Sequence, residues 1–116
     1  MHIVRVYTGD DGESHFEDVE IALGDPGRGG RLSEMVSAHG VIFRETGPDY
    51  DLDFHRAPRR QYVVNLSGSV ELTVGSGESR VLGPGEILLA EDTTGRGHKS
   101  RAVGTELRRC LFIPLA

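Results

Sequence analysis

Apolar and polar residues alternate in short runs along most of the chain. The segment 2–8 reads HIVRVYT, and the segment 70–74, VELTV, alternates strictly. A period of two residues places successive side chains on opposite faces of a β-strand. The pattern therefore predicts strands with one buried and one solvated face.

Further short apolar runs predict strands at 15–23, 41–45, 79–82, 86–90 and within 105–115. Glycine-rich turns separate them, and Gly75-Ser76-Gly77-Glu78 joins two of them as a hairpin. The segment 24–31, GDPGRGGR, predicts a loop, and 31–40 fits either a helical turn or a strand. This spacing predicts an all-β jelly-roll sandwich or barrel of roughly nine to eleven short strands.

Length and charge narrow the classes of function. A chain of 116 residues forms one domain, 1–116, and its net charge of −5 gives no general attraction to nucleic acid. Basic residues gather locally at 56–60 and 96–101, without the interleaved aromatic residues of a single-strand binder. A few convergent arginines are better suited to a small anionic molecule.

Cellular location follows from what the sequence lacks. Cys110 is the single cysteine, so no intrachain disulfide forms, and its apolar neighbours predict a buried thiol. No apolar run reaches the roughly 18 residues of a membrane span, and the first residues do not resemble a signal peptide. We expect a cytoplasmic protein with no membrane partner.

Two sets of residues resemble the motifs of the cupin superfamily. His55, Gln61 and Gly68 match the spacing of the first motif, and a Pro84-Gly85-Glu86 turn followed by His98 matches the second. The resemblance covers about 43–113. The segments APRRQ and EDTTGRGH are similar to those of small single-domain bacterial cupins, which implies a β-barrel, commonly homodimeric.

The metal motif of that family is only partly present. Ala57 stands where the second histidine is expected, and Gln61 replaces a glutamate. The resemblance implies that His55, Gln61 and His98 are the ligands of a divalent Fe, Mn, Ni or Zn ion. A neutral amide and a missing imidazole both lower the affinity for such an ion, so a metal-free cavity stays open as the alternative.

Strand parity suggests which basic side chain enters the barrel. If 55–61 stays extended, His55, Arg59 and Gln61 point the same way, and Pro58 leaves Arg60 as the substitute for Arg59. Arg59 or Arg60 would bind a carboxylate or enolate. The other interpretation of the arginine pair is a surface salt bridge to Asp51, Asp53 or Glu91.

Three further residues complete the predicted substrate site. Tyr50 can line an apolar pocket, and Thr93 and Thr94 offer hydroxyl donors in the loop before His98. A polar loop directly before this histidine favours a position at the rim of a pocket.

These residues predict an enzyme that acts on a small anionic organic molecule. His98 and His55 would serve as general acid or base, with Arg59 holding the substrate. The reaction would be an isomerisation, cyclisation, elimination or dioxygenation, with or without a divalent metal. The alternatives are a non-catalytic small-molecule-binding cupin that has lost its metal site, and a purely structural module.

Overall fold

The computed structural model describes residues 1–116, which form ten β-strands and no helix. The strands are β1 (His2–Thr8), β2 (Ser14–Glu20), β3 (Ile42–Thr46), β4 (Asp51–His55), β5 (Gln61–Ser67), β6 (Ser69–Thr73), β7 (Ser79–Leu82), β8 (Ile87–Glu91), β9 (His98–Val103) and β10 (Arg108–Pro114). The predicted all-β architecture is confirmed. No helix is present that could cross a membrane.

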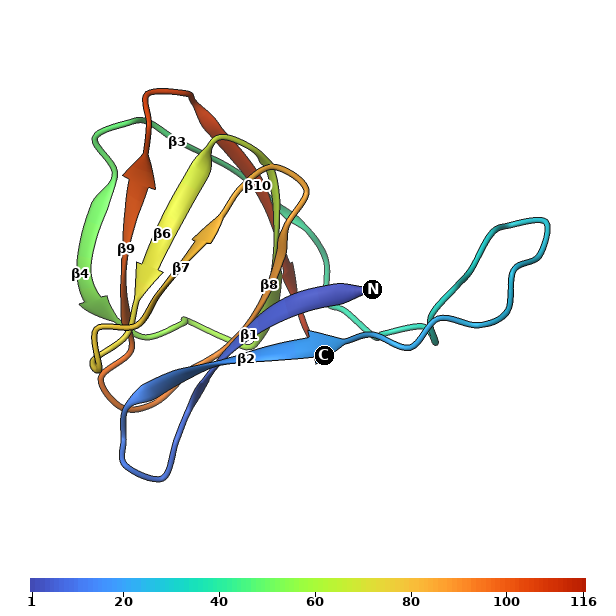
Figure 1. The fold of residues 1–116 in the computed structure, drawn as a ribbon, viewed down its shortest axis with the longest axis horizontal. Coiled ribbons are helices and arrows are strands. Elements are labelled where there is room, and N and C mark those ends of the chain that lie inside the picture. The colour runs from blue at the N-terminus through green and yellow to red at the C-terminus, as the bar shows by residue number, and fades with distance from the viewer.

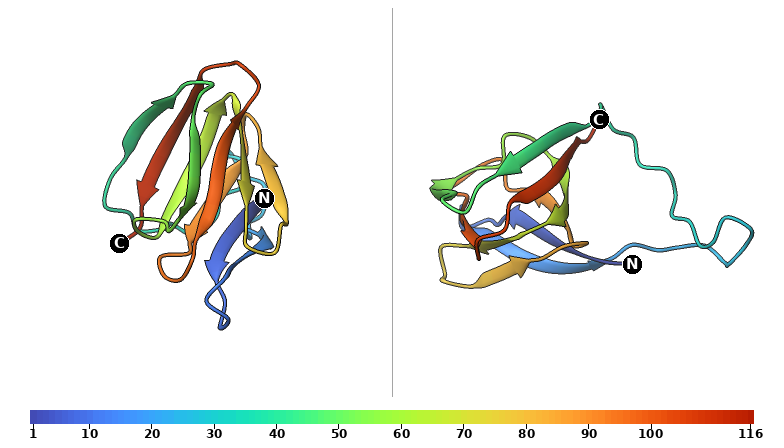
Figure 2. Two further views of the ribbon diagram at one scale, coloured as in Figure 1. Left: turned by 90° about the vertical axis from the view of Figure 1, so that its left-hand side faces the viewer. Right: turned by 90° about the horizontal axis from the view of Figure 1, so that it is seen from above.

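The strands form two facing sheets (Figures 1 and 2). One has six strands in the order β2-β1-β8-β5-β10-β3, and the other has four in the order β4-β9-β6-β7. All neighbouring strands are antiparallel except the β1–β8 pair, which is parallel. Strands that are distant in sequence are adjacent in the sheets, so residues from both halves of the chain line the space between the two sheets.

The core lies between the two sheets, and alternation along each strand explains its composition. In β5 the buried residues are Gln61, Val63 and Asn65, whereas the side chains between them face outward. The apolar members of the core pack together as one cluster of 11 buried residues, including Val4, Val6, Val63, Val70, Leu72, Val74, Leu82, Leu88, Ala90 and Cys110. Cys110 is a free buried thiol, as predicted.

Two expectations about local structure are corrected. The second strand ends at Glu20 rather than at 23, because β1 begins at His2 and only Met1 is left to bond Ile21, so the residues beyond have no strand partner. Residues 55–61 are not one extended strand: β4 ends at His55, and the chain turns through 56–60 before β5 begins. Because of this turn, the side chains of 55–61 do not alternate between two faces of one strand, and the expectation that Arg59 shares a face with His55 and Gln61 no longer applies.

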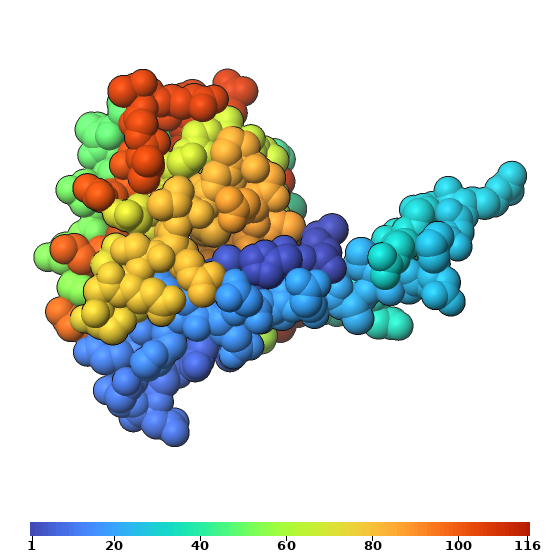
Figure 3. Space-filling model, viewed as in Figure 1, coloured from blue at the N-terminus to red at the C-terminus, as the bar shows by residue number.

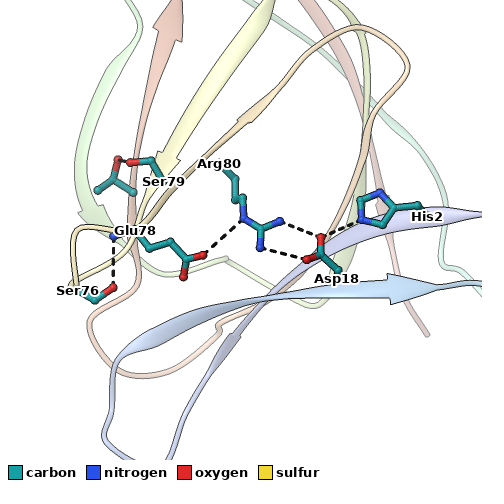
Figure 4. Close-up of polar contacts among 7 residues, drawn as sticks. His2, Asp18, Ser76, Glu78, Ser79 and Arg80 are labelled. Atoms are coloured by element: carbon teal, nitrogen blue, oxygen red, sulfur yellow. Dashed lines mark hydrogen bonds and ion pairs between the residues drawn. The ribbon is translucent and has the colours of Figure 1, made fainter.

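The open edges of the two sheets meet through an ion pair. Asp18 on β2 accepts hydrogen bonds from Arg80 on β7, at 2.9 and 3.3 Å, and its Oδ1 lies 2.9 Å from the His2 ring (Figure 4). β2 and β7 are the last strands of their sheets. The contact therefore joins the sheets at one side of the sandwich.

A long segment projects from the body between β2 and β3 (Figures 1 and 3). Every residue from Gly24 to Phe43 is exposed, and 21–41 contains no strand. The segment 31–40 is thus neither of the two elements considered for it. Near its end, the His39 N–H donates to the Pro114 carbonyl at 2.9 Å, which fixes the base of this arm to the last strand.

Candidate functional site

A cavity of about 220 Å³ opens between the two sheets. Sixteen residues line it, nine of them hydrophobic, and they come from strands of both sheets. The polar lining consists of Arg44, Tyr50, His55, Gln61, His98, Ser100 and Arg108. A largely apolar pocket with a few convergent polar groups is typical of a small-molecule site.

The two histidines predicted from the sequence motifs lie side by side in the cavity wall. His55 is the last residue of β4, His98 is the first of β9, and the two are cross-strand partners. Their ring centroids are 4.7 Å apart. Gly97 permits this approach, because its φ is +81° and a Cβ there would collide with the His55 carbonyl.

A buried carboxylate orients His98. Asp92 is fully buried, its Oδ2 lies 2.6 Å from His98 Nδ1, and the same oxygen accepts a hydrogen bond from the Ser14 hydroxyl at 2.7 Å. A carboxylate accepts, so Nδ1 carries the proton and Nε2 of neutral His98 has a free lone pair. His98 is therefore arranged to take up a proton at Nε2.

His55 has the same arrangement of its ring nitrogens. Its Nδ1 lies 2.8 Å from the Asp53 carbonyl oxygen, which can only accept. Neutral His55 is therefore protonated at Nδ1, and its Nε2 is also a free base. Two adjacent imidazoles, each with one uncommitted nitrogen, can transfer a proton to and from a bound molecule.

Two arginines in the cavity wall have no carboxylate partner. Arg108 on β10 is 5% exposed and donates from Nε to Asn65 Oδ1 at 2.8 Å. Half-buried Arg44 on β3 lies over the rings of Tyr50 and Phe112. The titratable neighbours that act on either guanidinium charge are Tyr50, Cys110 and, for Arg108, Arg44.

This setting makes the cavity electropositive. Burial lowers the pKa of Arg108, and the charge of Arg44 acts in the same direction. A guanidinium nonetheless stays protonated in proteins, so both charges persist. The buried carboxylate of Asp92 is already engaged by His98 and Ser14. The cavity thus holds positive charge that an incoming anion would neutralise.

The backbone at Gly68 holds Arg108 in place. Gly68 has a φ of +68°, and a Cβ on it would lie 2.9 Å from Arg108 Cα. The Asn65 amide donates to the Gly68 carbonyl at 2.8 Å and accepts from Arg108. The glycine recognised in the first motif therefore allows β10 to approach and present Arg108 to the cavity.

The other predicted substrate residues divide into two groups. Tyr50 lines the cavity, and its hydroxyl lies 2.7 Å from Ser100 Oγ. Thr93 and Thr94 are exposed and do not line the cavity, because the loop of 93–96 turns outward to contact the β1–β2 hairpin. Their expected position at the pocket rim is thus corrected.

The expected position of the Arg59–Arg60 pair inside the barrel is also corrected. Neither residue lines the cavity. Arg59 is exposed and donates to Gln61 Oε1 at 3.1 Å, whereas Arg60 forms an ion pair with Glu91. The turn through 56–60 leaves both side chains exposed, although the Arg59 guanidinium reaches back to Gln61 in the cavity wall. The surface salt bridge to Glu91 is the interpretation that holds for Arg60.

The polar groups in the cavity do not by themselves complete a metal site. His55 and His98 offer two imidazole nitrogens, but the Gln61 oxygen already accepts from the Arg59 cation. No three His, Cys, Asp or Glu side chains are arranged so that they could hold a metal ion together. Open metal sites generally use three protein ligands, so a divalent ion on His55, Gln61 and His98 stays a prediction that elemental analysis would check.

Sequence reasoning did not select Arg44, Arg108 or Ser100, and it gave Asp92 no part in orienting His98. Three of them continue the alternation of buried residues: Arg108 with Cys110, Ser100 with His98, and Asp92, just past the end of β8, with Leu88 and Ala90. A charged residue at an inward position is costly unless it is paired or functional. The inward position of these charged residues was the feature of the sequence that could have identified them.

Comparison with known proteins supports the fold. No protein-family model and no curated protein matches the sequence. Among solved structures, the crystal structure of protein NMB1881 from Neisseria meningitidis is similar, with a TM-score of 0.50 and 18% sequence identity. The match covers 72% of this chain and 81% of that chain. At this identity the likeness concerns the β-sandwich architecture alone.

Proposed function

We propose that this protein binds a small organic anion between its two sheets and moves a proton on it. Arg44 and Arg108 bind the anionic group, and His98, oriented by Asp92, acts as the base. The positions of His55, Gly68 and His98, together with the jelly-roll architecture, support placing the chain among the cupins.

The observation that carries this proposal is the pair of cavity arginines without a carboxylate. Arg108 is buried and its only side-chain hydrogen bond goes to a neutral amide, Asn65. An isolated buried charge costs several kcal/mol. A carboxylate or phosphate of a ligand would offset this cost through charge-assisted hydrogen bonds to the guanidinium groups.

The chemistry follows from the positions of the base and the cations. His98 Nε2 takes a proton from the carbon next to the ligand's carboxylate, and the electrons of the broken C–H bond move toward that carboxylate as an enolate. Arg44 and Arg108 stabilise the added negative charge. In an isomerisation, either imidazole then returns a proton to another carbon of the ligand. In an elimination, the enolate instead expels a leaving group.

A non-catalytic binding protein is the second candidate. Ala57 lines the cavity where the family places a histidine, and the Gln61 oxygen is taken up by Arg59. These two observations favour a domain that has kept its pocket without a complete metal shell.

Paired probe molecules test the binding step. We expect benzoate, malonate or phosphate to raise the melting temperature, whereas the uncharged analogue benzamide leaves it unchanged. An equal response to benzoate and benzamide, or no response to any anion, would contradict the anion site.

Hydrogen exchange tests the catalytic step separately. In D2O, a bound carboxylate with an acidic neighbouring C–H should acquire deuterium, as followed by NMR, and His98→Ala should abolish this exchange. Binding without exchange identifies the non-catalytic candidate. Elemental analysis of protein purified without chelators decides whether a transition metal accompanies the imidazoles.

A further inference from the structure

The strand register divides the cavity wall into levels, because the side chains of directly paired residues lie side by side. His55 is paired with His98, and Gln61 is paired with Ala90. Asp92, two residues beyond Ala90, lies 2.6 Å from His98 Nδ1 through its Oδ2. The two pairs, one from each sheet, therefore meet at one end of the cavity, which we call the histidine end.

The level next to the histidine end is almost entirely apolar. It lies two residues further along each strand, a rise of about 7 Å. In the six-stranded sheet it contains Val63 with its partners Leu88 and Phe112. In the four-stranded sheet it contains Ser100 with its partner Leu72. All five residues line the cavity, and only Ser100 has a polar side chain. We call this the apolar level.

Arg108 is held beyond the apolar level, at the opposite end of the cavity from the histidines. Its Nε donates to Asn65 Oδ1 at 2.8 Å. Asn65 lies four residues along β5 from Gln61, which corresponds to about 13 Å along the strand. The side chain of Arg108 makes no other hydrogen bond within the protein. Its two terminal nitrogens are therefore left for a ligand, and together they can bind a carboxylate in a bidentate manner.

Arg44 lies nearer to the middle of the cavity than Arg108. Its guanidinium carbon is 5.0 Å from the ring centroids of both Tyr50 and Phe112, and Phe112 belongs to the apolar level. The Tyr50 hydroxyl reaches the same level, 2.7 Å from Ser100 Oγ. One hydroxyl of this pair donates to the other, so the accepting hydroxyl keeps its own proton for a ligand. Arg44 and this hydroxyl offer a second position for an anionic group.

We propose that the ligand is a dianion, a short-chain dicarboxylate whose two carboxylates bind separately to Arg44 and Arg108. This assignment depends on the proposed function, whose anion it specifies. The carboxylate on Arg108 anchors the remote end of the molecule. The carbon next to the carboxylate on Arg44 then faces His98, and the rest of the carbon chain packs against apolar side chains of the cavity wall.

Charge and size both favour a short dianion. Neither guanidinium has a carboxylate partner in the protein, so a ligand with one carboxylate would leave one of two like charges uncompensated. Burial lowers the pKa of Arg108, and the charge of Arg44 adds to this effect, so a second negative charge on the ligand stabilises both cations. The cavity of about 220 Å³ is smaller than the roughly 300–1,000 Å³ of pockets for drug-sized molecules, which favours a short chain.

Glutarate and pentanoate test this assignment, because they have the same carbon chain and differ only in the second carboxylate. In calorimetric titrations of the full chain, we expect glutarate to bind about 10- to 30-fold more tightly than pentanoate. Arg108→Met should remove this preference, since it weakens the binding of glutarate and not that of pentanoate. Arg44→Met should weaken the binding of both probes, and Arg59→Met, outside the cavity, should alter neither.

The outcomes distinguish a failure of the dianion from a failure of the proposed function. Equal affinities for glutarate and pentanoate, or binding of benzoate with neither of them, overturn the dianion and leave the anion site in place. An equal loss for both probes in Arg108→Met also overturns it. The absence of binding by all three probes overturns the anion site itself. Arg108 is buried, so circular dichroism checks the folding of Arg108→Met, and the wild-type affinity ratio decides the question if that variant does not fold.

Discussion

Arginines on the outer surface and arginines in the cavity have opposite surroundings. On the surface, Arg80 pairs with Asp18, and both Arg5 and Arg60 pair with Glu91. In the cavity, Arg44 and Arg108 face tyrosine, cysteine and asparagine groups instead. These surface guanidinium groups therefore have carboxylate counter-ions. The two guanidinium groups in the cavity, which are less hydrated, have none.

Exposed ion pairs and buried unpaired charges differ in their contribution to the free energy of folding. A solvent-exposed ion pair contributes about 0–1 kcal/mol, so its presence says little about function. A buried charge without a counter-ion costs several kcal/mol. The uncompensated charge of Arg108 is therefore the reason for our proposal that an external anion completes the site.

The largest effect is expected at the buried carboxylate of Asp92, whose Oδ2 accepts a hydrogen bond from His98 Nδ1. His98→Ala leaves fully buried Asp92 with only Ser14 as a side-chain partner. We expect the free energy of unfolding to fall by about 3 kcal/mol, because an uncompensated charge stays buried. Chemical denaturation measures this. His55→Ala is the control and should cost about 1 kcal/mol, since only a hydrogen bond to the Asp53 carbonyl is lost.

The next effect concerns anion binding. Arg44→Met should weaken the binding of the tightest anionic probe about 10- to 30-fold, because one charge-assisted hydrogen bond disappears. The stability of the unliganded protein should be unchanged or higher, since a half-buried charge is replaced by an apolar chain of similar length.

Arg59→Met is the matched control for this measurement. Arg59 is exposed and outside the cavity, so calorimetric titration should show unchanged affinity. If Arg59→Met weakens binding and Arg44→Met does not, the anion binds where the sequence motif suggested rather than where the structure places it.

A surface pair should give a smaller change. Arg80→Met removes the link between the two sheet edges and should cost at most about 1 kcal/mol of unfolding free energy, with the loss shrinking as salt is added. Denaturation at low and high ionic strength measures both. A loss as large as that of His98→Ala would erase the proposed difference between the two regions.

The smallest effect is a pH dependence at Asp18. Hydrogen bonding to Arg80, followed by that to His2, lowers the pKa of this carboxyl from its ordinary 3.8 to about 2 (Figure 4). A lowered pKa in the folded state stabilises the protein above the ordinary value, and this stabilisation is lost as the pH falls toward about 2.

The variant Asp18→Asn isolates this contribution. Its stability difference from the wild type should be constant near neutrality and should vanish as the pH approaches 2, the folded-state value. Denaturation curves at a series of pH values measure it. A difference that persists through that range would mean that the carboxylate is not the stabilising group.

Local pattern was sufficient for several elements and insufficient for the turn before β5. The strands at 2–8 and 79–82 have the predicted bounds, because alternation and flanking glycines act over a few residues. The chain between His55 and Gln61 reverses the expected parity. His55 and Gln61 still reach the cavity, but Arg59 does not.

The sequence by itself determined the all-β architecture and the two histidines worth examining, since period, turns and motif spacing are properties of neighbouring residues. Only the tertiary structure decided which arginines face the cavity and that Asp92 orients His98. Strand order and register bring β3, β5, β9 and β10 around one space. Arg44 and Arg108, which are separated by half the chain, become neighbours there. No pattern among residues close in sequence predicts that they do.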